Sequence, residues 1–179
     1  MRERKILILL TRYPDVGSRL IEIFTGTYFT HASIGLDEDV NTFYSFNYKG
    51  FAVEKVERFA RLKGKGYPCQ LYELPVDEKT YRAMKQVLHG FVEHKNRFRY
   101  TRFGVAMCLL RIPYRRNGRF FCSQFVAEVL HRAQVVRLKK ASTLYLPCDF
   151  RSLPGIQLHL YGDLRDLKSH FGKVYASAA

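Results

Sequence analysis

The chain has 179 residues and a formal net charge of +14, from 30 Lys and Arg against 16 Asp and Glu. Hydrophobic residues make up 47%, which excludes a disordered chain and suits a single domain over residues 1–179. The positive charge favours anionic partners, but the basic residues are scattered along the chain, so nucleic acid is not the expected partner.

Four cysteines occur, at positions 69, 108, 122 and 148, and none belongs to a Cys-x-x-Cys pair. The apolar run at 6–10 is too short for the core of a signal peptide, and no run approaches the length of a membrane span. We therefore expect a cytoplasmic protein with free thiols, no transmembrane segment, no bound metal and no other cofactor.

In the first third of the chain, short apolar segments alternate with turns. The continuous run at 5–11 predicts a buried strand, and 18–26 predicts a helix that begins at Ser18. Residues 31–36 alternate between apolar and small or polar, as in a half-buried strand. Two further strands at 42–47 and 51–56 flank a turn, which indicates an antiparallel meander.

The rest of the chain is richer in helical patterns. The expected elements are a basic exposed loop at 61–66, a strand at 67–74 closed by Pro75, helices at 77–96, 100–110 and 122–133, and a last strand at 156–161. Strands early and helices late predict an α+β fold, with helices packed on an antiparallel sheet or partial barrel.

Cys122 lies where an exposed basic loop gives way to the helix predicted at 122–133. Free backbone N–H groups and the positive dipole end of a helix favour an anion at such a position, and a thiolate is an anion. The alternative is that Cys122 is a small buried hydrophobic residue, as most cysteines are.

A thiolate nucleophile needs a nearby base, and His31 is the strongest of six histidines for this role. It opens the strand at 31–36 and shares a face with Ser33 and Gly35, whose small size leaves room for another side chain or a ligand. The alternative is an ordinary half-exposed histidine. His131 follows Cys122 on the same helix by two and a half turns and points to the opposite side.

Three segments resemble the circularly permuted papain-like cysteine hydrolases of the NlpC superfamily, in particular the YiiX-like group of amidases and peptidases: 30–37 (THASIGLD), 44–46 (YSF) and 121–130 (FCSQFVAEVL). The resemblance implies a permuted papain-like fold, in which a strand carries the catalytic histidine and precedes the nucleophilic cysteine at a helix N-terminus. Residues 146–150 and 162–163 are similar to the closing part of such proteins.

By this resemblance Cys122 attacks an acyl carbonyl, His31 transfers the proton, and the Cys122 N–H contributes to an oxyanion hole. The third polar residue of the family aligns with Ser45, a weak orienting group, which leaves that role open to Asn47, Glu54 or a backbone carbonyl. Tyr100 corresponds to a tyrosine that lines the oxyanion side in related enzymes, and its alternative is a packed aromatic in a helix.

The resemblance implies a cysteine hydrolase acting on an amide or related acyl bond of a peptide-like or lipid-like substrate. Two alternatives remain: a non-catalytic papain-like binding protein, and a basic module for anionic surfaces or nucleic acid. The basic loop Arg111–Arg119 before the nucleophile is either a contact for an anionic surface or substrate, or solvated charge.

Overall fold

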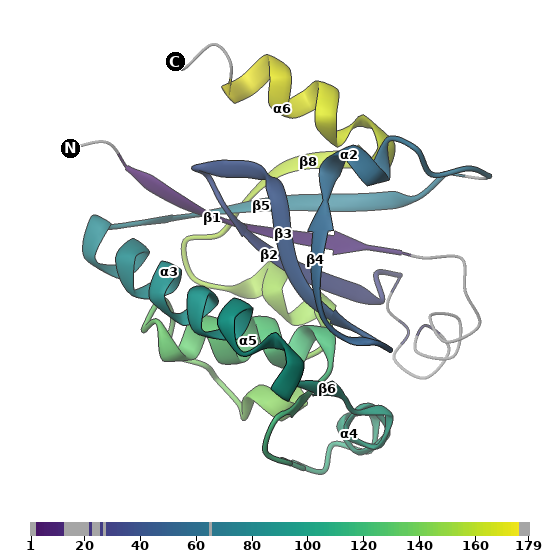
Figure 1. Ribbon diagram of the computed structural model, residues 1–179, viewed down its shortest axis with the longest axis vertical. Helices are drawn as coiled ribbons and strands as arrows, with labels where there is room; N and C mark the ends of the chain where they lie inside the picture. Colours follow the sequence, from purple (N-terminus) through teal and green to yellow (C-terminus); the bar gives the residue numbers. More distant parts are fainter. Residues whose placement is uncertain (1–2, 13–21, 23–25, 27, 65, 176–179) are drawn as a thin grey trace.

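The computed structural model describes residues 3–12, 22, 26, 28–64 and 66–175. Its centre is a six-stranded antiparallel sheet with the strand order β4-β3-β2-β1-β5-β8 (Figure 1). The strands are β1 Arg4–Thr11, β2 His31–Leu36, β3 Asp39–Asn47, β4 Gly50–Lys55, β5 Pro68–Val76 and β8 Gln157–Asp163. A separate parallel pair joins β6 Arg99–Tyr100 and β7 Arg119–Phe120.

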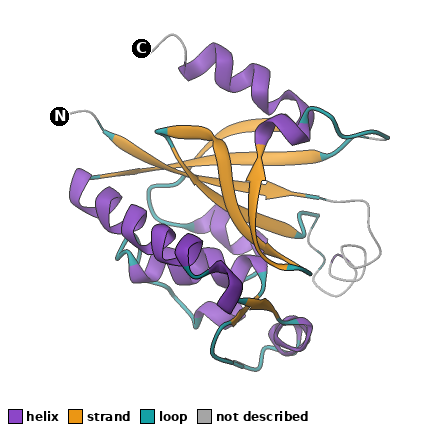
Figure 2. Ribbon diagram, viewed as in Figure 1, coloured by secondary structure: helices purple, strands orange, loops and turns teal. Residues whose placement is uncertain are grey.

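Helices cover both faces of the sheet (Figure 2). Buried residues of α3 Glu78–Glu93 and α5 Cys122–Arg132 pack on one face. Buried residues of α2 Val56–Phe59 and α6 Leu167–Tyr175 pack on the other. The remaining helix, α4 Arg102–Leu109, lies at the margin of the molecule, outside the layer formed by α3 and α5 (Figure 1). The expected α+β class with an antiparallel sheet is confirmed.

Strand β1 lies near the middle of the sheet and is buried on both faces. Ile6, Ile8 and Leu10 belong to the core beneath α3 and α5, whereas Leu7 and Leu9 belong to the core beneath α2 and α6. A strand covered on both sides needs apolar residues at every position, which explains why its sequence is a continuous apolar run and not an alternating one.

An aromatic cluster fixes the start of α5 against the rest of the core. It contains Phe46 and Phe51 of the β3–β4 hairpin, Phe91 of α3, and Phe120 and Phe125 on either side of Cys122. The ring centroids of Phe46 and Phe125 lie 5.2 Å apart, and those of Phe91 and Phe125 lie 4.9 Å apart. Because these rings come from three parts of the chain, they hold the helix start at a defined position on the sheet.

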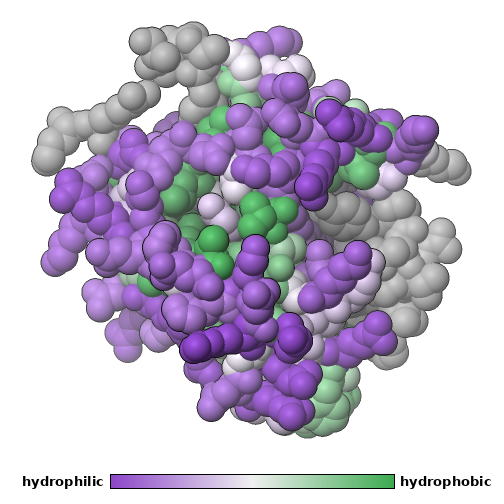
Figure 3. Space-filling view, viewed as in Figure 1, coloured by the Kyte–Doolittle hydropathy of each residue, from purple (hydrophilic) through white to green (hydrophobic). Residues whose placement is uncertain are grey.

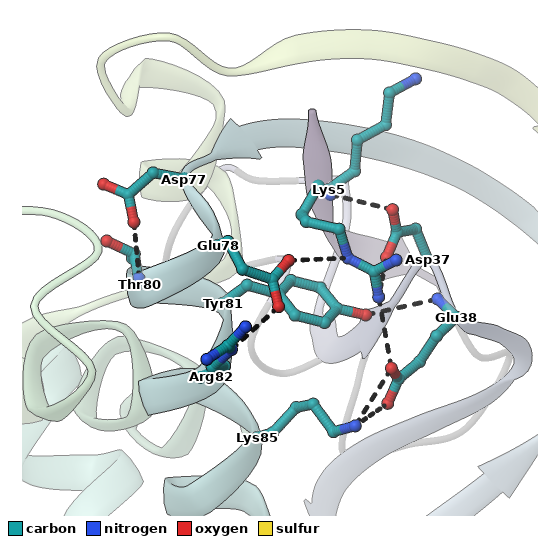
Figure 4. Close-up of polar contacts among 10 residues, drawn as sticks. Lys5, Asp37, Glu38, Asp77, Glu78, Thr80, Tyr81, Arg82 and Lys85 are labelled. Atoms are coloured by element: carbon teal, nitrogen blue, oxygen red, sulfur yellow. Dashed lines mark hydrogen bonds and ion pairs between the residues drawn. The ribbon is translucent and has the colours of Figure 1, made fainter. Parts of the chain in front are cut away.

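The start of α3 is tied to the β2–β3 turn by polar contacts (Figure 4). Asp77 caps the helix by accepting a hydrogen bond from the Thr80 N–H at 2.6 Å. The Tyr81 hydroxyl accepts a hydrogen bond from the Glu38 N–H, and Lys85 Nζ lies 2.8 Å from Glu38 Oε1. The helix predicted to begin at Asp77 is thus confirmed, with a side-chain cap of the usual kind.

The predicted end of the strand before Pro75 is wrong, since β5 continues to Val76. Pro75 pairs with Lys5 of β1, and the Lys5 carbonyl accepts instead from Asp37 on the β2 side. On the other edge of β5, the pairing with β8 ends at Glu73. Proline therefore lacks an N–H where neither neighbouring strand requires one.

One further expectation is corrected near the end of an element. The helix expected at 100–110 begins only at Arg102, because Arg99–Tyr100 form β6. Residues 167–175, for which no element was predicted, form α6, with Leu167 and Phe171 in the core. The helix expected at 18–26 lies outside the described residues, apart from positions 22 and 26. No helix in the described part of the chain is both long and apolar enough to cross a membrane.

Candidate functional site

Cys122 is the first residue of α5, and the residue before it leaves the helix start open. Phe121 occupies the N-cap position with extended backbone angles, φ −114° and ψ 168°, and contributes no side-chain capping bond. A phenyl ring has no acceptor atom, so the first N–H groups of the helix remain available to another anion or acceptor. The Cys122 sulfur occupies this position.

His31 is the first residue of β2, and its ring contacts a carboxylate. Its Nε2 atom lies 2.8 Å from Oε1 of Glu54, and the two side chains are only 12% and 13% exposed. Cys122 is a further side-chain hydrogen-bond partner of His31. Because Glu54 engages Nε2, Nδ1 is the ring nitrogen left for the sulfur.

The register of the sheet places Glu54 and His31 on the same face. Gly35 of β2 pairs with Phe43 of β3, and Phe43 pairs with Glu54 of β4, so all three residues lie on one face. His31 and Ser33 alternate onto the same face as Gly35. Small residues beside His31 leave space on this face, and the carboxylate of Glu54 reaches across it to the imidazole.

The cluster shifts the pKa values of the cysteine and the histidine in opposite directions. Burial alone would raise the pKa of Cys122, but the hydrogen bond and charge of His31, together with the N–H groups of Ala32 and Ser123, lower it below the ordinary thiol value. Burial alone would lower the pKa of His31, but the charge of Glu54 and the hydrogen bonds to Cys122 and Glu54 raise it well above its usual range. Both shifts favour the pair of thiolate and imidazolium over the neutral pair.

The other three thiols behave differently. Burial raises the pKa of Cys69 to about 12 and that of Cys108 to about 11. Burial also raises the pKa of Cys148. Cys122 is therefore the thiol among the four whose pKa is lowered, and it ionises most readily.

Ser45 and Tyr100 take positions that differ from their expected roles. The buried Ser45 hydroxyl donates to the Ala32 carbonyl at 2.7 Å, so it supports the backbone next to His31, while Glu54 is the side chain on the imidazole. Tyr100 lies on β6, not in a helix, and packs half-buried against the main core. The sequence left Glu54 as one alternative to Ser45. The signal that could have selected Glu54 is that it is the only acidic residue of β4.

A buried carboxylate holds the other half of α5 to the loop before Cys122. Glu128 accepts from Arg115 at 2.6 Å, from Arg132 at 2.8 Å and from Ser142 at 2.8 Å. Burial alone would raise the pKa of Glu128, but these hydrogen bonds and the charge of Arg132 lower it. The ionised Glu128 thus anchors the helix and one arginine of the loop that leads to Cys122.

A cavity of about 280 Å³ lies elsewhere, lined mainly by basic and polar residues, and contains none of Cys122, His31 and Glu54. Its lining includes Arg137, Lys139 and Lys140, the last paired with Asp149. Among the residues that the structure describes, no group of three or more His, Cys, Asp or Glu is arranged to hold a metal ion.

These contacts define an α+β protein with a buried Cys–His–Glu cluster at the start of a helix. Comparisons of the chain with protein-family models, with curated proteins and with solved structures found no match.

Proposed function

We propose that the protein is a cysteine hydrolase of the permuted papain-like type, which cleaves an amide or related acyl bond. The observation that carries the proposal is the chain of contacts Cys122–His31–Glu54, in which a cysteine at a helix N-terminus faces an imidazole held by a carboxylate. A nucleophile, a base and an orienting group in this order are what acyl transfer through cysteine requires.

In the first half-reaction, the Cys122 thiolate attacks the carbonyl carbon of the substrate and forms a sulfur–carbon bond. The carbonyl electron pair moves to oxygen, and the resulting oxyanion lies near the uncapped first turn of α5, where the Cys122 N–H donates to it. When the intermediate collapses, the bond to the leaving group breaks and the His31 imidazolium protonates that group. The products are an acyl-thioester on Cys122 and a neutral imidazole.

In the second half-reaction, neutral His31 removes a proton from water, which attacks the thioester carbonyl. Collapse of this intermediate expels the Cys122 thiolate and releases a carboxylic acid, and His31 is again an imidazolium. Glu54 orients the ring through Nε2 and stabilises the charged form of His31 in each half-reaction.

Peptide-like and lipid-like acyl groups both suit this chemistry, because each presents a carbonyl carbon to the thiolate. Tyr100, which precedes α4, is a candidate for lining the substrate side of the site. The same contacts would also serve a binding protein without turnover, and the experiment below separates these two functions.

The test is acylation of Cys122 by an activated ester, p-nitrophenyl acetate, followed by release of p-nitrophenolate and by the mass of the intact protein. We expect a burst of p-nitrophenolate, an acetyl adduct on the peptide that contains Cys122, and slow turnover. Cys122→Ser should abolish the burst and the adduct, whereas the matched variant Cys148→Ser should retain both.

An adduct that forms but never turns over would favour the binding protein. Labelling that is equal in Cys122→Ser and the unsubstituted protein would contradict both functions, because the reactive group would then lie elsewhere.

A further inference from the structure

A second feature, outside the cluster of Cys122, is an exposed apolar surface on α4 and the loop that follows it. Phe103, Leu110 and Ile112 are 59%, 67% and 46% exposed, and they lie within a segment of ten residues. In the space-filling view, hydrophobic side chains appear at the lower margin, where Figure 1 places α4 (Figure 3). We call these three residues, with Arg102, Arg111 and Arg116, the α4 surface.

The α4 surface belongs to a structured segment. Thr101 caps α4 by accepting from the Gly104 N–H at 2.9 Å, and the rings of Phe103 and Tyr114 make an edge contact at 4.9 Å. The helix and the loop are thus ordered together while their large apolar side chains point to solvent. Apolar side chains presented in this way on an ordered element are typical of a docking surface.

The charge around the α4 surface has one sign. Between Glu93 and Glu128 the chain contains no Asp or Glu and eight basic residues: Lys95, Arg97, Arg99, Arg102, Arg111, Arg115, Arg116 and Arg119. Of these, among the described residues, only Arg115 forms an ion pair, with Glu128. The partner of this surface is therefore anionic.

The apolar residues distinguish between anionic partners. Of the three apolar residues only Phe103 is aromatic. Leu110 and Ile112 cannot stack on bases, as the aromatic side chains of single-strand-binding proteins do. Exposed Phe, Leu and Ile beside unpaired arginines match the surface of a phospholipid bilayer, where the apolar side chains enter the acyl boundary and the arginines meet anionic headgroups. We propose that the α4 surface docks on an anionic phospholipid bilayer.

The position of the α4 surface links docking to the cluster of Cys122. The α4 segment begins after β6 and ends before β7. The pairing of β6 with β7 joins the two ends of this segment, and the Thr101 N–H also donates to the Phe120 carbonyl. Arg119 of β7 is three residues before Cys122. If the proposed hydrolase function holds, on which this last step rests, docking brings a lipid acyl carbonyl to the thiolate, so the substrate class is a membrane lipid.

The test is sedimentation of the full chain with vesicles of phosphatidylcholine, with and without phosphatidylserine. We expect binding only when phosphatidylserine is present, and weaker binding as salt rises. Arg102→Gln with Arg116→Gln should weaken binding by roughly tenfold or more. Leu110→Ser with Ile112→Ser should weaken binding to a similar degree. Because the arginines remain, this loss should be similar at low and high salt.

Matched controls come from exposed residues elsewhere on the molecule. Leu158→Ser removes an apolar side chain that is 54% exposed on β8, and Arg58→Gln with Lys79→Gln removes two charges from α2 and α3. These variants should bind as the unsubstituted protein does. The circular dichroism spectrum and thermal midpoint of each variant show whether it is folded.

Cys122→Ser should bind vesicles unchanged, which separates this proposal from the hydrolase. Absence of binding to phosphatidylserine vesicles, or equal loss in the α4 and control variants, would overturn it. Salt-sensitive binding to single-stranded DNA with no binding to vesicles would also overturn it and would assign the surface to nucleic acid. None of these results would alter the acylation of Cys122, so the two proposals fail independently.

Discussion

The two long helices that pack side by side on the sheet, α3 and α5, begin in opposite ways. At α3, the Asp77 carboxylate accepts from the Thr80 N–H, so the side chain before the helix satisfies its first turn. At α5, Phe121 offers no acceptor, and the sulfur of Cys122 takes the place of a cap, with the Ser123 N–H among its donors. The first arrangement stabilises a helix, whereas the second places a thiol with a lowered pKa at the helix N-terminus.

This difference shows why a helix N-terminus alone does not mark a site. The α5 start differs because a base and a carboxylate from distant strands, His31 and Glu54, converge on it. Changes at the α5 start should therefore alter reactivity, and changes at the α3 start should alter only stability.

The largest effect is expected from His31→Ala. Without the imidazolium, burial dominates and the pKa of Cys122 rises above the ordinary thiol value, so the thiolate fraction at neutral pH falls roughly a hundredfold. Alkylation of Cys122 by iodoacetamide, followed by peptide mass spectrometry, should slow by that factor. The control His89→Ala, at a side chain that is 70% exposed on α3, should leave the rate unchanged. An unchanged rate in His31→Ala would show that another group ionises the cysteine.

A smaller effect is expected from Glu54→Gln. The amide keeps the shape of the side chain but loses the charge that raises the pKa of His31, so hydrolysis of the activated ester should fall by about a hundredfold or less. The matched control Glu57→Gln, at an exposed position on α2, should retain full activity. If both variants kept full activity, Glu54 would have no part in orienting the imidazole.

The pH dependence of hydrolysis sharpens the role of Glu54. The lowered pKa of Cys122 sets the acid limb of the pH profile, so activity should persist below the ordinary thiol range. The raised pKa of His31 sets the alkaline limb, so activity should persist above the range of a free imidazole. Glu54→Gln should move the alkaline limb to lower pH, since the imidazolium loses its counter-charge. A merely structural role for Glu54 would lower the activity at every pH without moving that limb.

The smallest effect is expected at the start of α3. Asp77→Ala removes the cap and leaves the Thr80 N–H without its acceptor, so the urea midpoint of unfolding should fall modestly. Asp77→Ser keeps a capping oxygen, so its urea midpoint should lie between those of Asp77→Ala and the unsubstituted protein. Neither variant should change the alkylation rate of Cys122, and a change there would show that the two helix starts are coupled.

Local patterns were sufficient to predict the elements whose periodicity is strong. The run that became β1, the capped start of α3 and the helix beginning at Cys122 all carry their signals within a few residues. The ends of elements were harder: Pro75 stays in β5 because its neighbours need no N–H there, and α6 forms because Leu167 and Phe171 find a core made by distant strands.

The candidate site shows the same division between local and tertiary information. The contact of His31 with Cys122 was implied by the family resemblance and the order of its motifs, and the structure places the two side chains together. The choice between Ser45 and Glu54 depends on the register of the β3–β4 hairpin and on which atoms are already bonded, since Ser45 is used by the Ala32 carbonyl. No spacing in one strand contains that information.

The central claim is that Cys122 is ionised at neutral pH by a neighbouring imidazolium. The most direct measurement is the ultraviolet absorbance of the thiolate, recorded across pH as the difference between the unsubstituted protein and Cys122→Ser. The account predicts a difference signal that is fully present at neutral pH and disappears only on acidification below it. A signal that appears only as pH rises through the ordinary thiol range would contradict it.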